Sequence, residues 1–398
     1  MNPAPYVFNQ VVQWLPKDMF DRLVKKYNGN AYVKGYSCWN HLLVMIWAQL
    51  TSRRSLRDIE TTLRVHSDKT YRMGIGRTIS RNNIAHANAT REVGIYRELA
   101  QEMMRRVVRI EGRDKILDEI GKVFSIEGFL AIDSTTIYLD LRHHGWSVPQ
   151  RERGGVKVHT MFDLLRKVPR MCLVTGHEER DQTFIHDYPF EPDCLYIMDK
   201  AYCKTPGLYR IHKEGAFFLV RIKQNMVYDI LKRNPVQDGA SVLADDVIRF
   251  TGRTASQGYP PELRMVTYYS PENNLTFRFI TNHMDIEAAT LALLYLYRWE
   301  IEMFFKWIKQ HLRIINFFGH SENAVIIQIY TAFTAYCLLA LSAQETGFKG
   351  SLYDFANLVS TCLTEKEWLD VIVKRHQGSD NEGMFTEIPS LFDDIDYQ

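Results

Sequence analysis

The sequence predicts an α/β protein in which a mixed sheet with a β-rich insertion follows an all-α N-terminal domain. Apolar residues recur at helical spacing through residues 1–112, the pattern changes to short β-rich runs from about residue 124, and helical patterns return after residue 285. A chain of 398 residues also exceeds the usual size of one domain. We therefore expect several structural units.

The N-terminal domain, expected at residues 1–115, is basic. Residues 1–112 hold 18 Lys and Arg against 9 Asp and Glu, whereas the remainder holds 31 against 38. Ser55 and Ser80 are expected to cap helices on either side of the turn YRMGIGR, the second running to about residue 110. Two helices around a basic turn suit a helix-turn-helix-like DNA reader, and a plain bundle with solvated arginines is the alternative. The arginines concerned are Arg53, Arg54, Arg57, Arg72, Arg77 and Arg81.

Residues 120–223 alternate strands with one helix. The runs FLAIDSTTIYLDL, GVKVHTMFDLL and RMCLVTG predict three strands, and CLYIMDKAY predicts a fourth strand buried on both faces. Thr205 and Pro206 are expected to begin a helix, and AFFLVRIK predicts a fifth strand. A ribonuclease-H-like fold has this order of elements, so we expect such a domain in two parts, 120–223 and 286–345.

The remaining segments complete this organisation. Residues 224–285 predict a separate β-rich insertion, and helices are expected from Asp285, as their cap, to about residue 345. Residues 346–398 are expected to form a C-terminal helical segment and an acidic tail. The uncharged stretch 324–343 has the length of a membrane span, but its polar interruptions favour a buried core helix, so no membrane is expected.

The six cysteines show no disulfide or metal-ligand spacing, which favours a reducing cytoplasm. The chain carries no phosphate-binding glycine loop, so no nucleotide cofactor is expected.

Two aspartates stand at unusual places in the predicted strands. Asp133 lies inside the apolar run of the first strand, and Asp199 ends the buried fourth strand. An unpaired buried carboxylate costs several kcal/mol, so such residues need a partner charge, hydrogen bonds or a metal. Ligand sites of open α/β sheets lie beyond the carboxyl ends of strands, where Asp199 is expected. Taken singly, either residue is more often a structural Asp that caps a loop.

A third element joins these acids to cations. In YLYRWEIEMFFKWIKQHL, the residues Tyr295, Arg298, Glu302 and Lys309 fall on one side of a helix. Apolar residues cover most of the remaining circumference, which favours a buried helix with a narrow polar stripe over a salt-bridged surface helix. Three carboxylates from three elements can hold two hard divalent cations, and the cations beside them can neutralise phosphates. This combination suits the cutting or joining of polynucleotides.

The spacing Y-x2-R-x3-E-x6-K, together with Asp133 in AIDSTT and Asp199 in IMDKAY, resembles the signature of the DDE transposases of insertion-sequence family four. Arg221 in FFLVRIK matches the basic residue that often follows the second acid. The resemblance implies that Asp133, Asp199 and Glu302 are the metal-binding triad for two Mg²⁺ ions, for which Mn²⁺ can substitute. It further implies that Tyr295, Arg298, Lys309 and Arg221 hold DNA phosphates.

The same resemblance implies a cut-and-paste DNA transposase that acts on the inverted repeats of its own insertion sequence, through a hairpin intermediate, as a homodimer. In relatives, a Trp of the insertion stacks on a flipped base. Residues 224–285 contain no Trp, and Tyr268 or Tyr269 is the candidate replacement. Lys157 and His159, on a strand expected beside Asp133, are further candidates for the site, with a packed structural His as the alternative.

Two other functions remain open. An inactive or domesticated copy would act as a DNA-binding protein. The other is a ribonuclease-H-type nuclease, but the separation of 103 positions from Asp199 to Glu302 argues against it.

Overall fold

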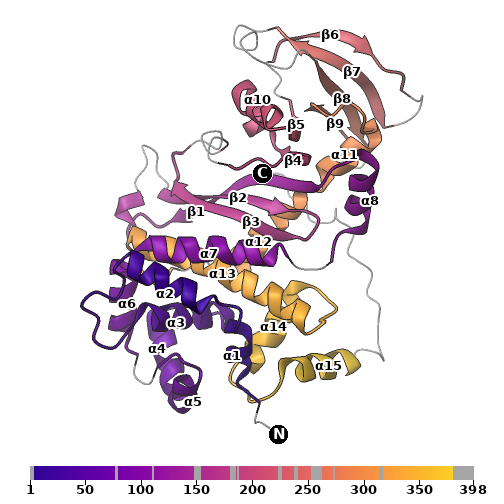
Figure 1. Ribbon diagram of the computed structural model, residues 1–398. Helices are drawn as coiled ribbons and strands as arrows, with labels where there is room; N and C mark the ends of the chain where they lie inside the picture. Colours follow the sequence, from indigo (N-terminus) through magenta and orange to yellow (C-terminus); the bar gives the residue numbers. More distant parts are fainter. Residues whose placement is uncertain are drawn as a thin grey trace.

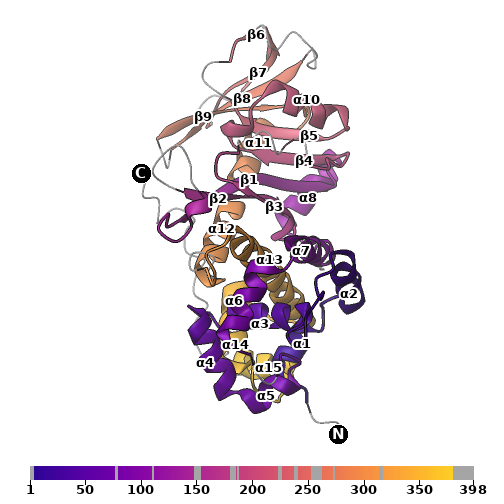
Figure 2. The same cartoon turned by 90° about the vertical axis from the view of Figure 1, so that its left-hand side faces the viewer.

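The computed structural model of the 398-residue chain describes residues 4–76, 79–109, 112–147, 154–179, 185, 188–222, 226–236, 241–251, 262–271, 274–312 and 317–379. Three bodies follow one another along the molecule (Figures 1 and 2): a helical body, a central part of a mixed sheet, and an outer group of strands. Arg77 of the expected DNA reader and residues 380–398 of the expected tail lie outside the described residues.

The helical body is built from both ends of the chain. Its helices are α1 (Val7–Val12), α2 (Lys17–Lys26), α3 (Cys38–Leu50), α4 (Leu56–Val65), α5 (Ser67–Arg72), α6 (Arg81–Thr90), α7 (Val93–Val107), α13 (Glu322–Glu345), α14 (Leu352–Cys362) and α15 (Leu369–Ser379). The Val7 amide donates to the Glu365 carbonyl at 3.0 Å, and the Phe8 amide to that of Leu363 at 3.1 Å. The N-terminal region is helical as predicted, but it shares one apolar core with the C-terminal helices.

The expected helix from Ser80 to residue 110 is wrong in one respect, because it is two helices. Ser80 caps α6 as predicted, since its side chain accepts from the Asn83 amide. The chain then becomes extended at Arg91 before α7 begins. The buried Arg91 guanidinium donates to the carbonyls of Gly29 and Tyr36, and this tertiary anchor holds the break.

Helix α13 is the segment that resembles a membrane span. It is long and apolar enough to cross a membrane, yet 89% of its most apolar window is buried inside the protein. It packs against α3 and α7, and the Gln328 side chain accepts from the Phe318 amide at 2.8 Å. The prediction of a buried core helix is confirmed.

The described strands form one sheet. They are β1 (Gly128–Leu139), β2 (Gly154–Asp163), β3 (Val168–Gly176), β4 (Cys194–Met198), β5 (Phe217–Arg221), β6 (Tyr228–Arg233), β7 (Val242–Phe250), β8 (Leu263–Ser270) and β9 (Leu275–Thr281). Their order is β3-β2-β1-β4-β5-β9-β8-β7-β6. Strands β1 to β3 are antiparallel, and β4 and β5 run parallel to β1. Three antiparallel strands followed by two parallel ones are the sheet of a ribonuclease-H-like fold, as predicted.

The strands expected at residues 224–285 are present as β6 to β9, but they do not form a sheet of their own. Strand β9 pairs antiparallel with β5, with Leu219 opposite Thr281, so these strands extend the central sheet. Pairing across that edge satisfies the backbone N–H and C=O groups that would stay unpaired if these strands formed a separate sheet. The division into domains stays a prediction.

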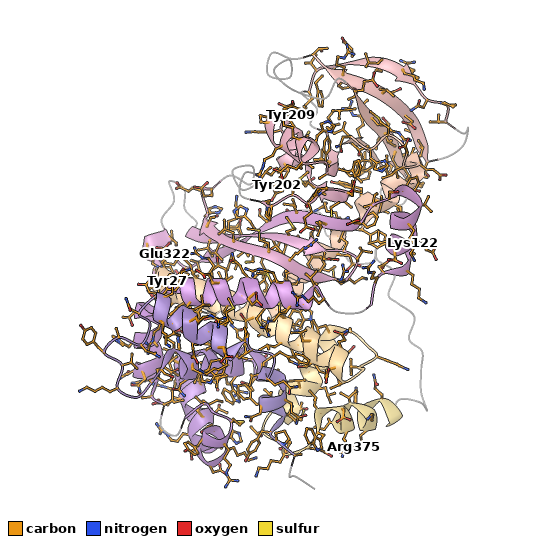
Figure 3. The ribbon with its side chains drawn as sticks, viewed as in Figure 1. Tyr27, Lys122, Tyr202, Tyr209, Glu322 and Arg375 are labelled. Carbon is orange, nitrogen blue, oxygen red and sulfur yellow. The ribbon has the colours of Figure 1, made fainter. Side chains whose placement is uncertain are left out.

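Helices cover both faces of the sheet. Helix α8 (Lys115–Phe124) leads into β1, α10 (Thr205–Lys213) follows β4, and α11 (Ala288–Leu296) and α12 (Trp299–His311) follow β9. Phe129 and Ala131 of β1 belong to the core that contains α12 and α13, whereas Leu130 and Ile132 belong to the core of α10. Figure 3 shows Tyr209 on α10 and Tyr202 near it, away from Tyr27 in the helical body.

The expected cap of the late helices is wrong. Helix α11 begins after Glu287, not Asp285, and no side chain caps it. The Asp285 amide instead donates to the His283 ring at 3.3 Å, so this residue belongs to the turn that leaves β9.

Candidate active site

Strand β1 places Asp133 on the face of the sheet that α12 covers. Alternation along a strand sends Asp133 to the same face as Phe129 and Ala131, which lie in the core shared with α12. The Asp133 side chain is 20% exposed, and one of its oxygens accepts from the Ser134 amide at 2.8 Å. The first candidate acid is therefore largely buried but reachable from solvent.

Asp199 follows the last residue of β4. Strand β4 is buried throughout and runs parallel to β1, with Met198 opposite Ile132. Parallel strands bring their carboxyl ends to one edge, so Asp199 comes next to Asp133 on the neighbouring strand. Asp199 accepts a hydrogen bond from the Tyr295 hydroxyl at 3.3 Å.

The third acid and the candidate cations come from α11 and α12. The single helix expected here is broken: Tyr295 lies in α11, and Arg298 precedes the first residue of α12. Despite the break, Tyr295, Arg298 and Lys309 all contact residues of β1 or the end of β4. The Arg298 guanidinium donates to Asp133 Oδ2 at 3.1 Å and pairs with Glu302 Oε1 at 2.6 Å. Lys309 Nζ donates to Thr135 Oγ1 at 2.6 Å.

Burial and charge act against each other in this group. Burial raises the pKa of Asp133 to about 6, although Arg298 opposes the shift, and the nearby Glu302 and Asp199 charges add to it. Burial disfavours the charged Arg298, but Tyr295, Glu302 and Asp133 outweigh it and raise the Arg298 pKa. Burial also lowers the pKa of Lys309. The site therefore holds more negative charge than Arg298 alone neutralises.

Arg221 lies at the edge of this group rather than in it. Its guanidinium is 5.0 Å from the Phe277 ring of β9, and its charge is one of those that act on Tyr295, whose pKa burial raises. Phe279, two residues along β9, packs against the Tyr295 ring at 4.4 Å between centroids. Strand β9 of the insertion thus supports the Tyr295 end of the stripe.

Lys157 and His159 do not join the acids. Residues opposite one another on paired strands share a face, and His159 lies opposite Ser134, Lys157 opposite Thr136. Both side chains therefore occupy the face away from Asp133. Lys157 donates to the Glu179 carbonyl at 2.7 Å, and His159 contacts Thr175 Oγ1 at 2.9 Å. The expectation that they face the site is wrong, and strand alternation is the reason.

Two residues of the site were not among the sequence candidates. The Thr135 hydroxyl and the Thr136 carbonyl accept hydrogen bonds from Lys309 Nζ, at 2.6 Å and 3.2 Å, and so fix the position of Lys309 over β1. The sequence signal was the group of hydroxyl residues directly after Asp133 in AIDSTT.

The two tyrosines proposed to stack on a flipped base both have partners within the protein. The Tyr269 hydroxyl donates to Asn274 at 3.0 Å, and Tyr268 packs partly buried against the core.

The N-terminal arginines divide into two groups. Arg53 donates to Asp58 at 3.3 Å and to Thr62 at 3.2 Å, so it stabilises the start of α4. Arg54, Arg57, Arg72 and Arg81 are exposed around α4, α5 and the start of α6. The exposed group forms a basic surface on the helical body.

The chemistry of the candidate acids suits a divalent metal. All donors at the centre are carboxylate oxygens, which hard divalent cations prefer, and two of the acids already converge on a single cation, Arg298. The Arg298 Nε is buried with no hydrogen-bond partner in the described residues, so the guanidinium is not fully satisfied. In the described part of the chain and in this conformation, no three side chains of His, Cys, Asp or Glu are grouped closely enough to hold an ion.

The fold and this group of side chains define a class: proteins that place carboxylates and cations together on a ribonuclease-H-like sheet. Comparison with known families then identifies the chain. Residues 125–338 match the family described as "Transposase DDE domain", and residues 5–76 match a domain of unknown function, DUF4372. The chain belongs to the DDE transposase family, whose members are enzymes acting on DNA and typically use divalent metals.

Individual relatives agree with this family. The chain is 31% identical over 290 residues to a putative transposase, y4zB, of Sinorhizobium fredii, covering 71% of this chain and 77% of that protein. It is 29% identical over 216 residues to a probable transposase for insertion sequence element IS5377 of Geobacillus stearothermophilus, covering 54% and 56%. It is 24% identical over 378 residues to a putative transposase for IS4SA of Synechocystis, covering 89% and 99%.

Among solved structures, the chain is similar to a piggyBac transposase synaptic complex with hairpin DNA. The TM-score is 0.48 and the identity 12%, with 96% of this chain and 85% of that chain covered. Assignment to family four within the DDE transposases stays a prediction.

Proposed function

We propose that this protein is a cut-and-paste DNA transposase that excises its own insertion sequence and joins the 3′ ends to target DNA. One observation carries the proposal: the Arg298 guanidinium contacts both Asp133 and Glu302, while the Tyr295 hydroxyl from the same stripe donates to Asp199. The three candidate acids and the proposed phosphate-binding groups thus come from different elements to one edge of the sheet. This is the composition that phosphoryl transfer on DNA requires.

Each group has a proposed role. Asp133, Asp199 and Glu302 would hold two Mg²⁺ ions, or Mn²⁺ in their place, which supply activation of the attacking oxygen and stabilisation of the leaving oxygen. Arg298 and Lys309 bind the phosphates on either side of the cut, and Arg221 and Tyr295 position the strand from the β9 side. The exposed arginines of α4 to α6 bind the terminal inverted repeats.

The strand chemistry is a series of phosphoryl transfers. A water oxygen bonds to phosphorus while the bond to the 3′ oxygen breaks, which leaves a 3′-hydroxyl and a 5′-phosphate. The freed 3′-hydroxyl attacks phosphorus in the opposite strand, and the bond from that phosphorus to the 3′ oxygen of the flanking DNA breaks, which closes a hairpin on the element end. Hydrolysis reopens the hairpin and restores the 3′-hydroxyl. This hydroxyl then attacks a target phosphorus, and the bond to the target 3′ oxygen breaks. Pairing of two ends requires two copies of the chain, and the setting is the bacterial cytoplasm at the nucleoid.

The first test is to sequence the DNA on both sides of the gene. Imperfect inverted repeats near the reading frame, bordered by short direct repeats, would support a mobile element and supply the cleavage substrate. If these repeats are missing, the DNA-binding-protein alternative is favoured.

The second test is cleavage of that substrate by the purified full chain in Mg²⁺. Asp133→Ala, Asp199→Ala and Glu302→Ala should each lower the cleavage rate by at least ~10³-fold while repeat binding in a gel shift is retained. Glu300→Gln is the matched control on α12, because Glu300 pairs with Lys167 at 3.0 Å, outside the site. Cleavage at the wild-type rate by any triad variant would refute the triad. Metal-independent binding by the wild type without cleavage would favour the binding-protein alternative.

A further inference from the structure

One arginine occupies the point where two of the proposed metal ligands meet. Its two terminal nitrogens divide between the acids, with Nη1 at 3.1 Å from Asp133 Oδ2 and Nη2 at 2.6 Å from Glu302 Oε1. The Arg298 side chain is 9% exposed, whereas those of Asp133 and Glu302 are 20% and 34% exposed. The two carboxylates are therefore more accessible to an ion from solvent than the guanidinium between them.

This contact conflicts with metal binding by the same oxygens. A carboxylate that bonds a guanidinium offers fewer lone pairs to an ion, and two cations at one point repel each other. The conformation agrees with that conflict, since no group of three acidic, His or Cys side chains in the described residues is arranged to hold an ion.

The guanidinium also contacts two aromatic rings beside the acids. Its central carbon lies 5.6 Å from the Tyr295 ring and 5.8 Å from the Trp299 ring, and the Trp299 side chain is partly exposed. An aromatic face binds a guanidinium by a cation–π contact, and Arg298 Nε lacks a hydrogen-bond partner among the described residues. Among the described residues, the hydrogen bonds of Arg298 to side chains are therefore those to the two acids, and the ring contacts do not depend on them.

We propose that Arg298 is an internal counter-cation that competes with the divalent metal for Asp133 and Glu302. In the metal-free protein it holds the two acids together, and metal binding displaces it from at least one of them toward Trp299, where it is free to contact DNA phosphate. The inference rests on the proposed function, because it takes Asp133 and Glu302 as metal ligands. It goes beyond that function because it gives Arg298 a role in the DNA-free protein, as the counter-cation of the two acids.

The test is calorimetric titration of Mn²⁺ into the DNA-free full chain, which needs no catalytic activity. Removing the competing cation in Arg298→Gln should tighten Mn²⁺ binding by ~10-fold. Arg298→Lys keeps the charge but loses the planar fork that bridges two carboxylates, so binding should tighten by a smaller factor, roughly threefold. The Lys variant also decides the question if the Gln variant does not fold.

Lys309→Gln is the matched control. It removes a positive charge from the same stripe, but Lys309 bonds the Thr135 hydroxyl and the Thr136 carbonyl rather than an acid. Its Mn²⁺ affinity should stay close to that of the wild type. Equal tightening in Lys309→Gln and Arg298→Gln, with none in Arg298→Lys, would mean that charge alone acts and would overturn the inference.

The remaining outcomes separate the two proposals. Wild-type affinity in both Arg298 variants overturns the inference alone. No Mn²⁺ binding by the wild type and by both Arg298 variants, or unchanged binding in Asp133→Ala, overturns the proposed function and the inference with it.

Discussion

Two largely buried arginine–aspartate pairs lie in different parts of the sheet, and their surroundings differ. In the outer strands, Arg264 holds both oxygens of Asp245, at 2.8 Å and 2.7 Å, and also donates to the carbonyls of Met284 and Ile286. Every donor nitrogen of Arg264 therefore has a partner. In the candidate site, Arg298 divides its terminal nitrogens between two acids and leaves Nε without a partner in the described residues.

The aspartates respond in opposite directions. Burial opposes ionisation of Asp245, but the bonds from Arg264 outweigh it and lower the Asp245 pKa. At Asp133 burial wins over Arg298, and the pKa rises to about 6. The Arg264 pair stabilises the fold and joins the strands to the start of α11. The Arg298 group instead holds an excess of negative charge, as a cation-binding site requires.

The largest expected effect comes from breaking the satisfied pair. Asp245→Asn leaves the Arg264 charge buried without a counter-charge, and we expect a loss of ~3 kcal/mol in the free energy of unfolding. Urea denaturation measures it. Asp370→Asn, in an exposed pair with Lys374, is the control and should show no measurable loss. Equal losses in both variants would remove the contrast between the pairs.

The same substitution in the site should act in the opposite direction. Asp133→Asn removes a carboxylate whose ionisation the metal-free fold disfavours, so at pH 7.5 the variant should gain about 2 kcal/mol of stability while it loses cleavage. Urea denaturation with a chelator present measures the gain. A loss as large as that of Asp245→Asn would show that Asp133 is a structural partner of Arg298.

The pH dependence of stability should separate the pairs further. The folded pKa of Asp133 is raised, from 3.8 to about 6, so its favourable contribution is complete below pH 3.8 and is lost as the pH rises through 6. The metal-free wild type should therefore lose about 2 kcal/mol relative to Asp133→Asn between pH 4 and pH 7. Saturating Mg²⁺ favours the ionised form and should abolish this difference.

For Asp245 the sign is reversed. Its folded pKa is lowered, so its contribution is present above the ordinary value of 3.8 and is lost as the pH falls through the lowered one. The stability gap between the wild type and Asp245→Asn should consequently shrink on acidification. Parallel pH curves for the two Asn variants would contradict the comparison.

The smallest effect is expected at the Lys309 end of the stripe. Thr135→Val removes the hydroxyl that accepts from Lys309, which then keeps the Thr136 carbonyl alone, and the cost should be about 1 kcal/mol. Thr135→Ser retains the hydroxyl and serves as the control in urea denaturation. If both variants lose equal stability, the methyl packing of Thr135 matters more than its hydrogen bond.

Much of the fold was predictable because it depends on local patterns. Ser55 and Ser80 cap the helices that their sequences indicate, and the short apolar runs form β1 to β5 at the expected places. The errors lie where distant groups intervene. The break at Arg91 depends on carbonyls of Gly29 and Tyr36, and the pairing of β9 with β5 depends on an edge that no local pattern describes.

The site divides in the same way. Spacing alone put Tyr295, Arg298, Glu302 and Lys309 on one side of a helix. In the structure, Tyr295 contacts Asp199, Arg298 contacts Asp133 and Glu302, and Lys309 contacts Thr135 of β1. The proposed roles of these residues stay predictions. The faces of neighbouring strands were not predictable, since a register change of one residue reverses every side chain. That register put Lys157 and His159 on the far face.

The sequence by itself determined the fold class, the family and the set of candidate acids and cations, because strand runs, helix caps and residue spacing are local properties of the chain. Only the tertiary structure decided that Arg298 lies between Asp133 and Glu302, and that Arg264 fully satisfies Asp245. The physical reason is that desolvation and hydrogen-bond satisfaction depend on what surrounds a group in space. Two pairs made of the same two residue types therefore differ in charge balance once folded.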